Sequence, residues 1–432
     1  MPIMATSVMQ MAFNLADMFW LSNMEGGTGA VAAAGTAGMY LWLSMSLIFI
    51  GRMGAEIGVS QNIGKGDIAA AKSFAQQSLM LSVVLGVLYA IAMVVFRGPL
   101  IAIFRIDDAQ VVLQSEQYLA FTAIALPFIF AHHVITGCFN GFGNTKLPFY
   151  VNSVCLALNI AITPIFIFAL NMGIIGAAVG TIIASVANLA LKLWALKRYS
   201  GRPFESFKFF TAFDKNRIRQ IFKWGLPVAA ESSLFTVFYM IVSILVASFG
   251  VYAIAAQRVG TQIESLGWMM SGGFASAVTA FVGQNYGAKK FGRLARGYKI
   301  SIIAMAIYGA FVTFVLFVFA EPLVSLFLTE PPAIEIGVTL LRILALLQIL
   351  GCMEGVAAGA FRGKGLTMKP TIVSVSSNGI RVILCYALAS TALGLDGIWY
   401  GIAIAVVIRG LWLLTWYYIN ARKFPAVDEE VR

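Results

Sequence analysis

The chain has 432 residues, of which 60% are hydrophobic and 11% are charged, whereas a soluble domain carries about one quarter charged residues. This composition, with a mean hydropathy of +0.86, excludes an ordinary soluble protein, because such a protein needs a charged, mixed surface. We expect lipid to be the solvent. At about 20 residues per crossing, the chain accommodates roughly a dozen transmembrane helices and no large extramembrane domain.

Twelve apolar runs, separated by Gly, Pro or charged residues, are long enough to cross a bilayer. In chain order they cover about 2–22, 30–51, 76–96, 116–138, 148–170, 174–197, 222–249, 252–282, 298–320, 336–360, 370–392 and 397–420. Proline and glycine inside several runs predict kinks, because neighbouring helices can satisfy the freed backbone groups. The pattern predicts an all-α polytopic membrane protein.

Positive charge is distributed unevenly along the chain. If both termini are cytoplasmic, the inner loops and the tail hold 24 of the 30 Lys and Arg residues, whereas the outer loops hold two, Arg97 and Arg105. The other four lie inside the spans or at their edges: Arg258, Arg342, Arg381 and Arg409. This asymmetry follows the positive-inside rule. We therefore interpret the net charge of +11 as a topology signal and predict no nucleic-acid partner.

The two halves of the sequence resemble each other. Four short segments of the first half recur 221 to 223 residues later, in the same order. The pairs are 61–64 with 284–287, 96–100 with 319–323, 141–148 with 363–370, and 173–180 with 394–401. Each half holds six predicted spans, an even number, so both halves have the same orientation. We expect two six-helix bundles related by a pseudo-two-fold axis along the membrane normal.

This repeat, together with the longest polar stretch of the chain, predicts the domain limits. We expect an amino-terminal bundle at 1–198, a cytoplasmic linker at 199–221, a carboxy-terminal bundle at 222–420 and a cytoplasmic tail at 421–432. Two parallel bundles are an architecture that alternating-access transporters use.

The repeated turns also resemble those of a known family. The runs 137–148, 359–365 and 60–67, and the segment 14–17 of the first span, are similar to motifs of the multidrug and toxic compound extrusion (MATE) family. The resemblance covers essentially the whole chain and is greater to the prokaryotic, DinF-like branch than to the eukaryotic one. It implies a twelve-helix antiporter that expels amphipathic, mostly cationic compounds in exchange for H⁺ or Na⁺.

Asp17, in the first span, is the leading candidate for proton coupling. Ionisable side chains are costly in lipid and are functional candidates by default. Asp17 lies roughly 24 Å along the first helix, and Asn14 stands one turn before it on the same face. The alternative is a polar cap at the mouth of the helix, wetted from outside. The resemblance favours the coupling role, because it places the coupling carboxylate of the amino-terminal bundle at this motif.

Three further residues of the amino-terminal bundle are expected around Asp17. Tyr118 and Asn159 resemble the hydrogen-bonding partners of that carboxylate in the family. Proton-coupled members often carry a second carboxylate four residues after the Asn, but here that position is Thr163. We therefore expect Asp17 to work largely alone or with the other bundle. A structural alternative for Thr163 is a hydroxyl that satisfies backbone freed by the following proline.

Five residues of the carboxy-terminal bundle are candidates for binding a cation or substrate: Glu231, Gln257, Glu264, Glu354 and Arg381. Structural ion pairing is an equal alternative, because Arg258, Arg381 and Arg409 supply enough cations to neutralise the three acids. We predict no metal site, because no His, Cys or carboxylate spacing typical of one is present.

The sequence predicts a secondary active multidrug antiporter driven by H⁺, with Na⁺ as the alternative ion, that works by alternating access. It is expected to be a monomer in a bacterial or archaeal cytoplasmic membrane, in contact with lipid and with small amphipathic drugs or toxins. A lipid-linked oligosaccharide flippase of related fold is the alternative function. Such a flippase is expected to line its cavity with Arg or Lys, and the first bundle has neither at the centre of a predicted span. No catalytic constellation or cofactor motif is present, so we predict neither an enzyme nor a cofactor.

Overall fold

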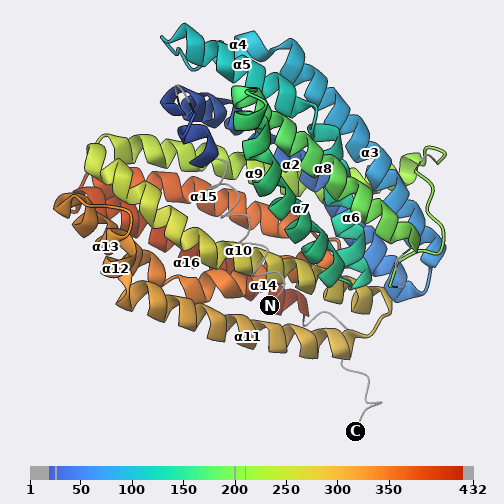
Figure 1. Cartoon of the computed structure of the whole chain (residues 1–432). Helices are drawn as coiled ribbons and strands as arrows, with labels where there is room; N and C mark the ends of the chain where they lie inside the picture. The colour runs from blue at the N-terminus through green and yellow to red at the C-terminus, as the bar shows by residue number, and fades with distance from the viewer. Residues whose placement is uncertain (1–18, 25–26, 199–200, 210, 422–432) are drawn as a thin grey trace. The chain divides into compact units, whose positions relative to one another are not determined.

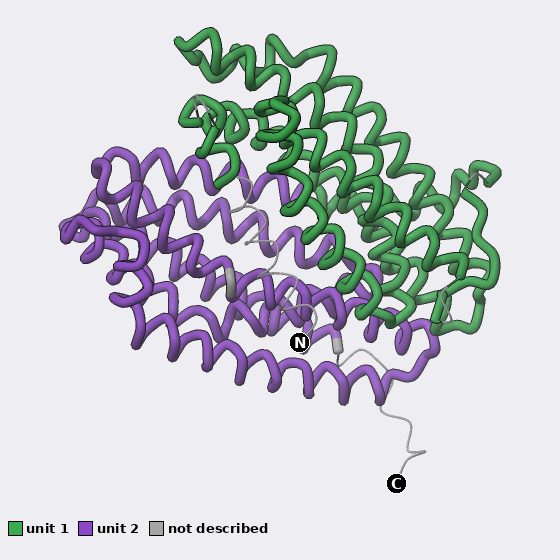
Figure 2. Tube along the Cα trace, in the orientation of Figure 1, with its two compact units in different colours: residues 1–229 green, residues 230–432 purple. Residues whose placement is uncertain are grey.

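The computed structural model describes residues 19–24, 27–198, 201–209 and 211–421 (Figure 1). Every regular element within these ranges is a helix. The helices belong to two compact units, Met1–Ala229 and Ala230–Arg432, which Figure 2 shows in different colours. The first predicted span, 2–22, lies mostly outside the described residues.

The first unit contains seven α-helices and one π-helical turn among its described residues, before α9 begins. These are α2 (Gly27–Lys65), α3 (Ile68–Val95), α4 (Arg97–Ala102), α5 (Ala109–Ala123), α6 (Leu126–Phe142), α7 (Lys146–Pro164), η1 (Ile165–Ala169) and α8 (Gly173–Arg198). Helix α9 (Lys215–Ala247) begins in the first unit and continues into the second. The second unit continues with α10 (Val251–Gly287), α11 (Phe291–Val318), α12 (Ala320–Ser325), α13 (Pro331–Ala345), α14 (Gln348–Gly363), α15 (Met368–Ala389) and α16 (Gly394–Ala421).

Nine helical segments of the described chain are long and apolar enough to cross a membrane by themselves. Two further crossings are bent pairs, α5 with α6 at 46° and α13 with α14 at 49°. The described residues therefore account for up to eleven crossings, and the predicted first span would make twelve.

The sequence repeat corresponds to a repeated helix plan. Helices α3, α4 and α5 have 28, 6 and 15 residues, and α11, α12 and α13 have the same three lengths. Helix α4 begins at Arg97 and α12 begins at Ala320, which is an offset of 223 residues. Each unit also contains one bent pair at the same place in its element order.

Glycine pairs explain why these segments recur in the first unit. A Cβ atom on Gly137 of α6 would lie 2.8 Å from the backbone oxygen of Arg52 on α2, and one on Gly141 would lie 2.7 Å from that of Glu56. Small residues four apart let two membrane helices approach this closely. The two glycines therefore determine how near α6 lies to α2.

The second unit uses the same device between α14 and α10. A Cβ atom on Gly359 would lie 2.4 Å from the backbone oxygen of Ala275, and one on Gly363 would lie 2.5 Å from that of Thr279. The glycine spacing that marks the repeat in the sequence is thus a repeated helix contact.

Two basic residues that were expected in cytoplasmic loops lie inside helices. Helix α2 continues to Lys65, so Arg52 belongs to the helix and not to the loop after a span that ends at residue 51. Lys192 belongs to α8, and its side chain is fully buried. The loop assignment was wrong for both, because a single basic residue at the edge of an apolar run does not end a helix.

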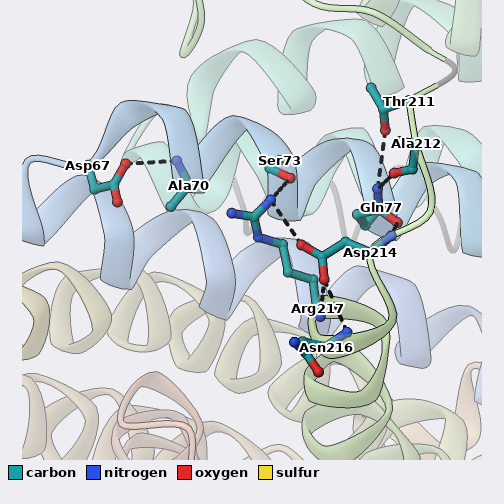
Figure 3. A network of polar contacts seen from close by, with 9 residues as sticks. All are labelled: Asp67, Ala70, Ser73, Gln77, Thr211, Ala212, Asp214, Asn216 and Arg217. Carbon is teal, nitrogen blue, oxygen red and sulfur yellow. Dashed lines mark hydrogen bonds and ion pairs between the residues drawn. The ribbon is translucent and has the colours of Figure 1, made fainter.

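The polar stretch before α9 is held against α3 (Figure 3). The Gln77 side chain donates to the Thr211 hydroxyl at 3.2 Å and to the Ala212 carbonyl at 2.7 Å. Its own oxygen accepts from the backbone N–H of Asp214 at 3.2 Å. One glutamine of α3 thus satisfies three groups of this extended segment.

The start of α9 is tied to the same face of α3 (Figure 3). Asp214 accepts from the backbone N–H groups of Asn216 and Arg217 at 3.0 and 3.1 Å, as a residue that caps a helix does. The Arg217 guanidinium pairs with Asp214 at 3.4 Å and donates to the Ser73 hydroxyl. The polar segment is therefore an ordered part of the first unit.

Candidate functional site

Two of the candidate residues, Asn14 and Asp17, lie outside the described residues. Their proposed partners in the first unit are described. Asn159 and Thr163 are buried on α7, with 1% and 0% of their surface exposed. The Thr163 hydroxyl donates to the side-chain oxygen of Asn159 at 3.3 Å, so the structure brings these two candidates together.

Local helix geometry explains the position of Thr163. Pro164 ends α7, and the chain continues as the π-helical turn η1. A π-turn re-forms the hydrogen bonding that a proline interrupts. On the facing helix α8, a Cβ atom on Gly180 would lie 2.5 Å from the Thr163 hydroxyl. Glycine at that position therefore leaves space for the polar pair between α7 and α8.

The amide nitrogen of Asn159 is a buried donor. Within the part of the chain that the structure describes, this Nδ2 atom has no hydrogen-bond partner. An unsatisfied donor in an apolar environment is costly, so it marks a place where an acceptor can bind. Tyr118, the third expected partner, is buried on α5 in the same hydrophobic core as Ile174 and Ala177 of α8.

In the second unit, Glu231 of α9 is part of a small polar cluster. One carboxylate oxygen lies 3.2 Å from the Arg362 guanidinium at the end of α14, and it accepts from the Thr371 hydroxyl of α15, also at 3.2 Å. Arg362 was not among the arginines expected to neutralise the acids. Its place at the end of an apolar run indicated an inner loop, and no sequence pattern links it to a residue 131 positions earlier.

Glu264 of α10 is held mainly by neutral donors. Its carboxylate accepts from the Trp268 indole N–H at 3.0 Å and from the Gln348 side chain of α14 at 3.1 Å. The charges of Arg381 and Arg409 also act on it. The structure therefore groups two candidates, Glu264 and Arg381, with partners that the sequence did not single out.

Glu354 of α14 forms the most buried ion pair of this region. It lies 3.1 Å from the Arg409 guanidinium of α16, and the two side chains are 16% and 7% exposed. Arg409 also lies over the Trp268 ring at 5.2 Å. Because Trp268 donates to Glu264, one network links the two acids through an arginine and an indole.

Gln257 is buried two turns before Glu264 on α10. Its amide nitrogen has no hydrogen-bond partner among the described residues. No group of three or more His, Cys, Asp or Glu side chains in the described chain could hold a metal ion. The remaining polar feature is Lys192, which lies buried in the first unit and which the sequence had assigned to a loop.

A helical membrane chain with a repeated plan and buried polar side chains is common to several transporter families, and the comparison with known sequences decides between them. The sequence pattern of the MatE family matches residues 2–165 and 227–387, most of both halves. The chain belongs to the MatE family. MatE proteins are transporters and need no cofactor, so this chain is a multi-pass membrane transporter and not an enzyme.

Named relatives and solved structures agree with the family. A probable multidrug resistance protein NorM of Thermotoga maritima is 26% identical over 419 residues, covering 95% of this chain and 88% of that protein. The probable multidrug resistance protein YoeA of Bacillus subtilis is 26% identical over 430 residues, covering 98% and 92%. A crystal structure of a MATE protein in complex with MaD3S shares the fold at a TM-score of 0.91, with 23% identity and coverage of 98% and 94%. The twelve-helix, two-bundle fold class is confirmed.

Proposed function

We propose that this MatE protein exports amphipathic, mostly cationic compounds in exchange for H⁺, by alternating access. The family supports transport, and the names of the relatives from Thermotoga maritima and Bacillus subtilis support multidrug efflux. Proton coupling and the cationic substrate class are inferences from the residues of this chain and from the resemblance of its motifs.

The observation that carries the proposal is the buried, unpaired amide nitrogen of Asn159. An amide N–H beside a carboxylate stabilises the ionised form, and losing that carboxylate charge by protonation weakens the bond. Asp17 is the carboxylate that the motif pairs with Asn159, with Asn14, Tyr118 and Thr163 around it. We infer that Asp17 alternates between a proton and the cationic substrate, and that protonation promotes substrate release to the outside.

The acids of the second unit are assigned a different role. Glu231 and Glu354 are each paired with an arginine, and Glu264 already accepts two hydrogen bonds. A carboxylate with such partners is a weaker ligand for a further cation than an unpaired one. We propose that these three acids, with Arg381, mainly hold the second unit together, while Gln257 offers a free donor to a substrate.

The remaining parts of the proposal concern placement and assembly. We propose a monomer in a bacterial or archaeal cytoplasmic membrane, with both termini in the cytoplasm, as the 24 inner basic residues indicate. The proposed functional segments are the bundles 1–198 and 222–420, the linker 199–221 and the tail 421–432.

Transport into reconstituted vesicles tests this function. The probe is tetraphenylphosphonium, an amphipathic cation, and a pH gradient and a Na⁺ gradient are imposed separately. We expect the pH gradient alone to drive uptake and the Asp17→Asn variant to fall to the level of empty vesicles. The matched control is Asp107→Asn, which changes an exposed carboxylate in the loop before α5 and is expected to transport as wild type.

Two results would contradict the proposal at different points. Uptake driven by Na⁺ alone would replace the coupling ion. Full activity of Asp17→Asn would remove the carboxylate from the mechanism while leaving the family assignment intact.

A further inference from the structure

Lys192 is a fully buried lysine whose described hydrogen bonds all go to neutral groups. Its ammonium donates to the Thr136 hydroxyl of α6 and to the Asn152 side-chain oxygen of α7, both at 2.8 Å. It also donates to the backbone oxygen of His132 at 3.4 Å. A buried cation is normally paired with a carboxylate, and none of these partners is one.

The neighbours hold two of these acceptors in a fixed orientation. The Asn188 amide donates to the same Asn152 oxygen at 3.1 Å, so this oxygen faces Lys192 and its amide nitrogen faces away. The Thr136 hydroxyl donates to the His132 carbonyl at 3.0 Å, which leaves a lone pair for Lys192. These bonds preorganise a cage for one ammonium group among α6, α7 and α8.

The imidazole of His132 makes the same cage suitable for a neutral amine. Its Nδ1 atom lies 3.5 Å from the Lys192 nitrogen, and its ring lies 4.3 Å from the ring of His133. A neutral imidazole accepts at one ring nitrogen and donates at the other, and which nitrogen carries the proton can change. When Lys192 is an ammonium, Nδ1 accepts; when it is an amine, an Nδ1–H group can donate to the nitrogen lone pair.

The other titratable groups near Lys192 are few. Arg52 of α2 acts on it and forms a 3.7 Å ion pair with Glu56, so these two charges compensate each other. Cys155 of α7 and His133 of α6 also interact with it. Loss of one proton from Lys192 therefore changes the cluster by one charge without leaving a buried carboxylate unpaired.

We propose that Lys192 is a second proton-exchanging group of the first unit, which releases a proton during one half of the transport cycle and regains it during the other. In the release step the Lys192 N–H bond breaks, the electron pair stays on nitrogen, and the proton passes to water. The inference rests on the proposed H⁺ antiport, and it adds a site that is separate from Asp17.

Two substitutions separate proton exchange from a structural tie. Lys192→Met removes both the charge and the exchangeable proton, whereas Lys192→Arg keeps the charge and several hydrogen bonds but does not release a proton near neutral pH. We expect both variants to lose at least tenfold in pH-driven tetraphenylphosphonium uptake while their affinity for this probe changes less than threefold. The matched control is Lys197→Met, an exposed lysine on the same helix, which is expected to keep wild-type uptake.

Wild-type uptake by Lys192→Arg or by Lys192→Met would overturn the proposal, since a tie that only needs a charge or a side chain of similar length is structural. If neither variant folds, the Asp17→Asn protein supplies the test. Proton release on adding tetraphenylphosphonium, measured with a pH indicator in weakly buffered detergent solution, is expected to persist there at a reduced amount. Complete loss would leave no second group and overturn the inference. If wild type itself shows no proton release and no pH-driven uptake, the antiport proposal fails first.

Discussion

The two units repeat one helix plan but place different charges at equivalent interior positions. With the sequence offsets of 221 and 222 residues, three uncharged polar residues of the first unit correspond to three charged residues of the second. The pairs are His132 with Glu354, Asn159 with Arg381, and Asn188 with Arg409.

These positions do different work in the two units. In the second unit Arg409 and Glu354 form a buried ion pair, whereas in the first unit His132 lies beside the unpaired ammonium of Lys192. The glycine contacts, by contrast, are the same in both units. Helix distances are thus preserved by glycine, while the interior polar positions can specialise for holding a unit together or for exchanging a proton.

Removing one cation from each unit is the strongest test of this contrast. Arg409→Met leaves the Glu354 carboxylate buried without its counter-ion, so we expect the free energy of unfolding to fall by about 3–5 kcal/mol. Lys192→Met leaves only neutral groups behind, and we expect a loss of about 1–2 kcal/mol. Both are measured by denaturant titration of the purified protein in detergent, followed by tryptophan fluorescence. Equal losses would contradict the difference between the units.

A double variant provides the control for this measurement. Arg409→Met combined with Glu354→Gln removes both charges of the pair, and most of the lost stability is expected to return. A double variant as unstable as Arg409→Met alone would show that the loss comes from the packing of Arg409 against Trp268.

The glycine contacts predict a smaller effect that is equal in both units. Gly137→Ala and Gly359→Ala each place a methyl group against a backbone oxygen, and each is expected to lower the free energy of unfolding by about 1–3 kcal/mol. The matched controls are Gly35→Ala and Gly379→Ala, where nothing lies within 4 Å of the new Cβ atom. These are expected to stabilise by about 0.5–1 kcal/mol, because alanine favours helix. A large loss in one unit only would break the structural repeat.

Much of the fold could be predicted because its causes are local or repeated in the sequence. Apolar run lengths predict the crossings, and glycines at a constant offset predict the two units. The partners of the acids could not be predicted in the same way, since Glu231 pairs with Arg362, which is 131 residues away and resembles a loop residue. Lys192 was missed for a related reason: in the sequence it resembles the first of many basic residues of the central loop, and only the packing of α8 against α6 and α7 shows that it is buried.

The end of α14 offers a pH-dependent contrast. Lys364 follows α14 and is 5% exposed, and its amine lies 4.2 Å from the centre of the Tyr417 ring. With the offset of 222, its counterpart in the first unit is Phe142. Burial, together with the like charge of Lys369, lowers the pKa of Lys364 from 10.5 to about 8. The charged form is therefore disfavoured in the folded protein.

The sign of the pH effect follows from this lowered pKa. Below pH 8 folding carries the full cost of burying the ammonium, and between about pH 8 and 10.5 that cost disappears as the folded protein stays neutral. Wild type is therefore expected to gain roughly 2 kcal/mol between pH 7 and pH 10 relative to Lys364→Phe, which cannot titrate. The difference between their melting curves at each pH isolates this residue. A constant difference would mean that Lys364 has the same pKa folded and unfolded.

The polar segment before α9 carries the smallest expected effect. Gln77→Ala removes the three bonds that hold residues 211–214 to α3, but most of the groups it frees can bind water at the surface. We expect the free energy of unfolding to change by less than about 1 kcal/mol, with protease cleavage within residues 201–214 accelerated several-fold. Gln110→Ala, on the exposed start of α5, is the matched control and is expected to leave cleavage unchanged. Unchanged cleavage in Gln77→Ala would mean that the buried side chains of Phe204 and Phe207 hold the segment without help from α3.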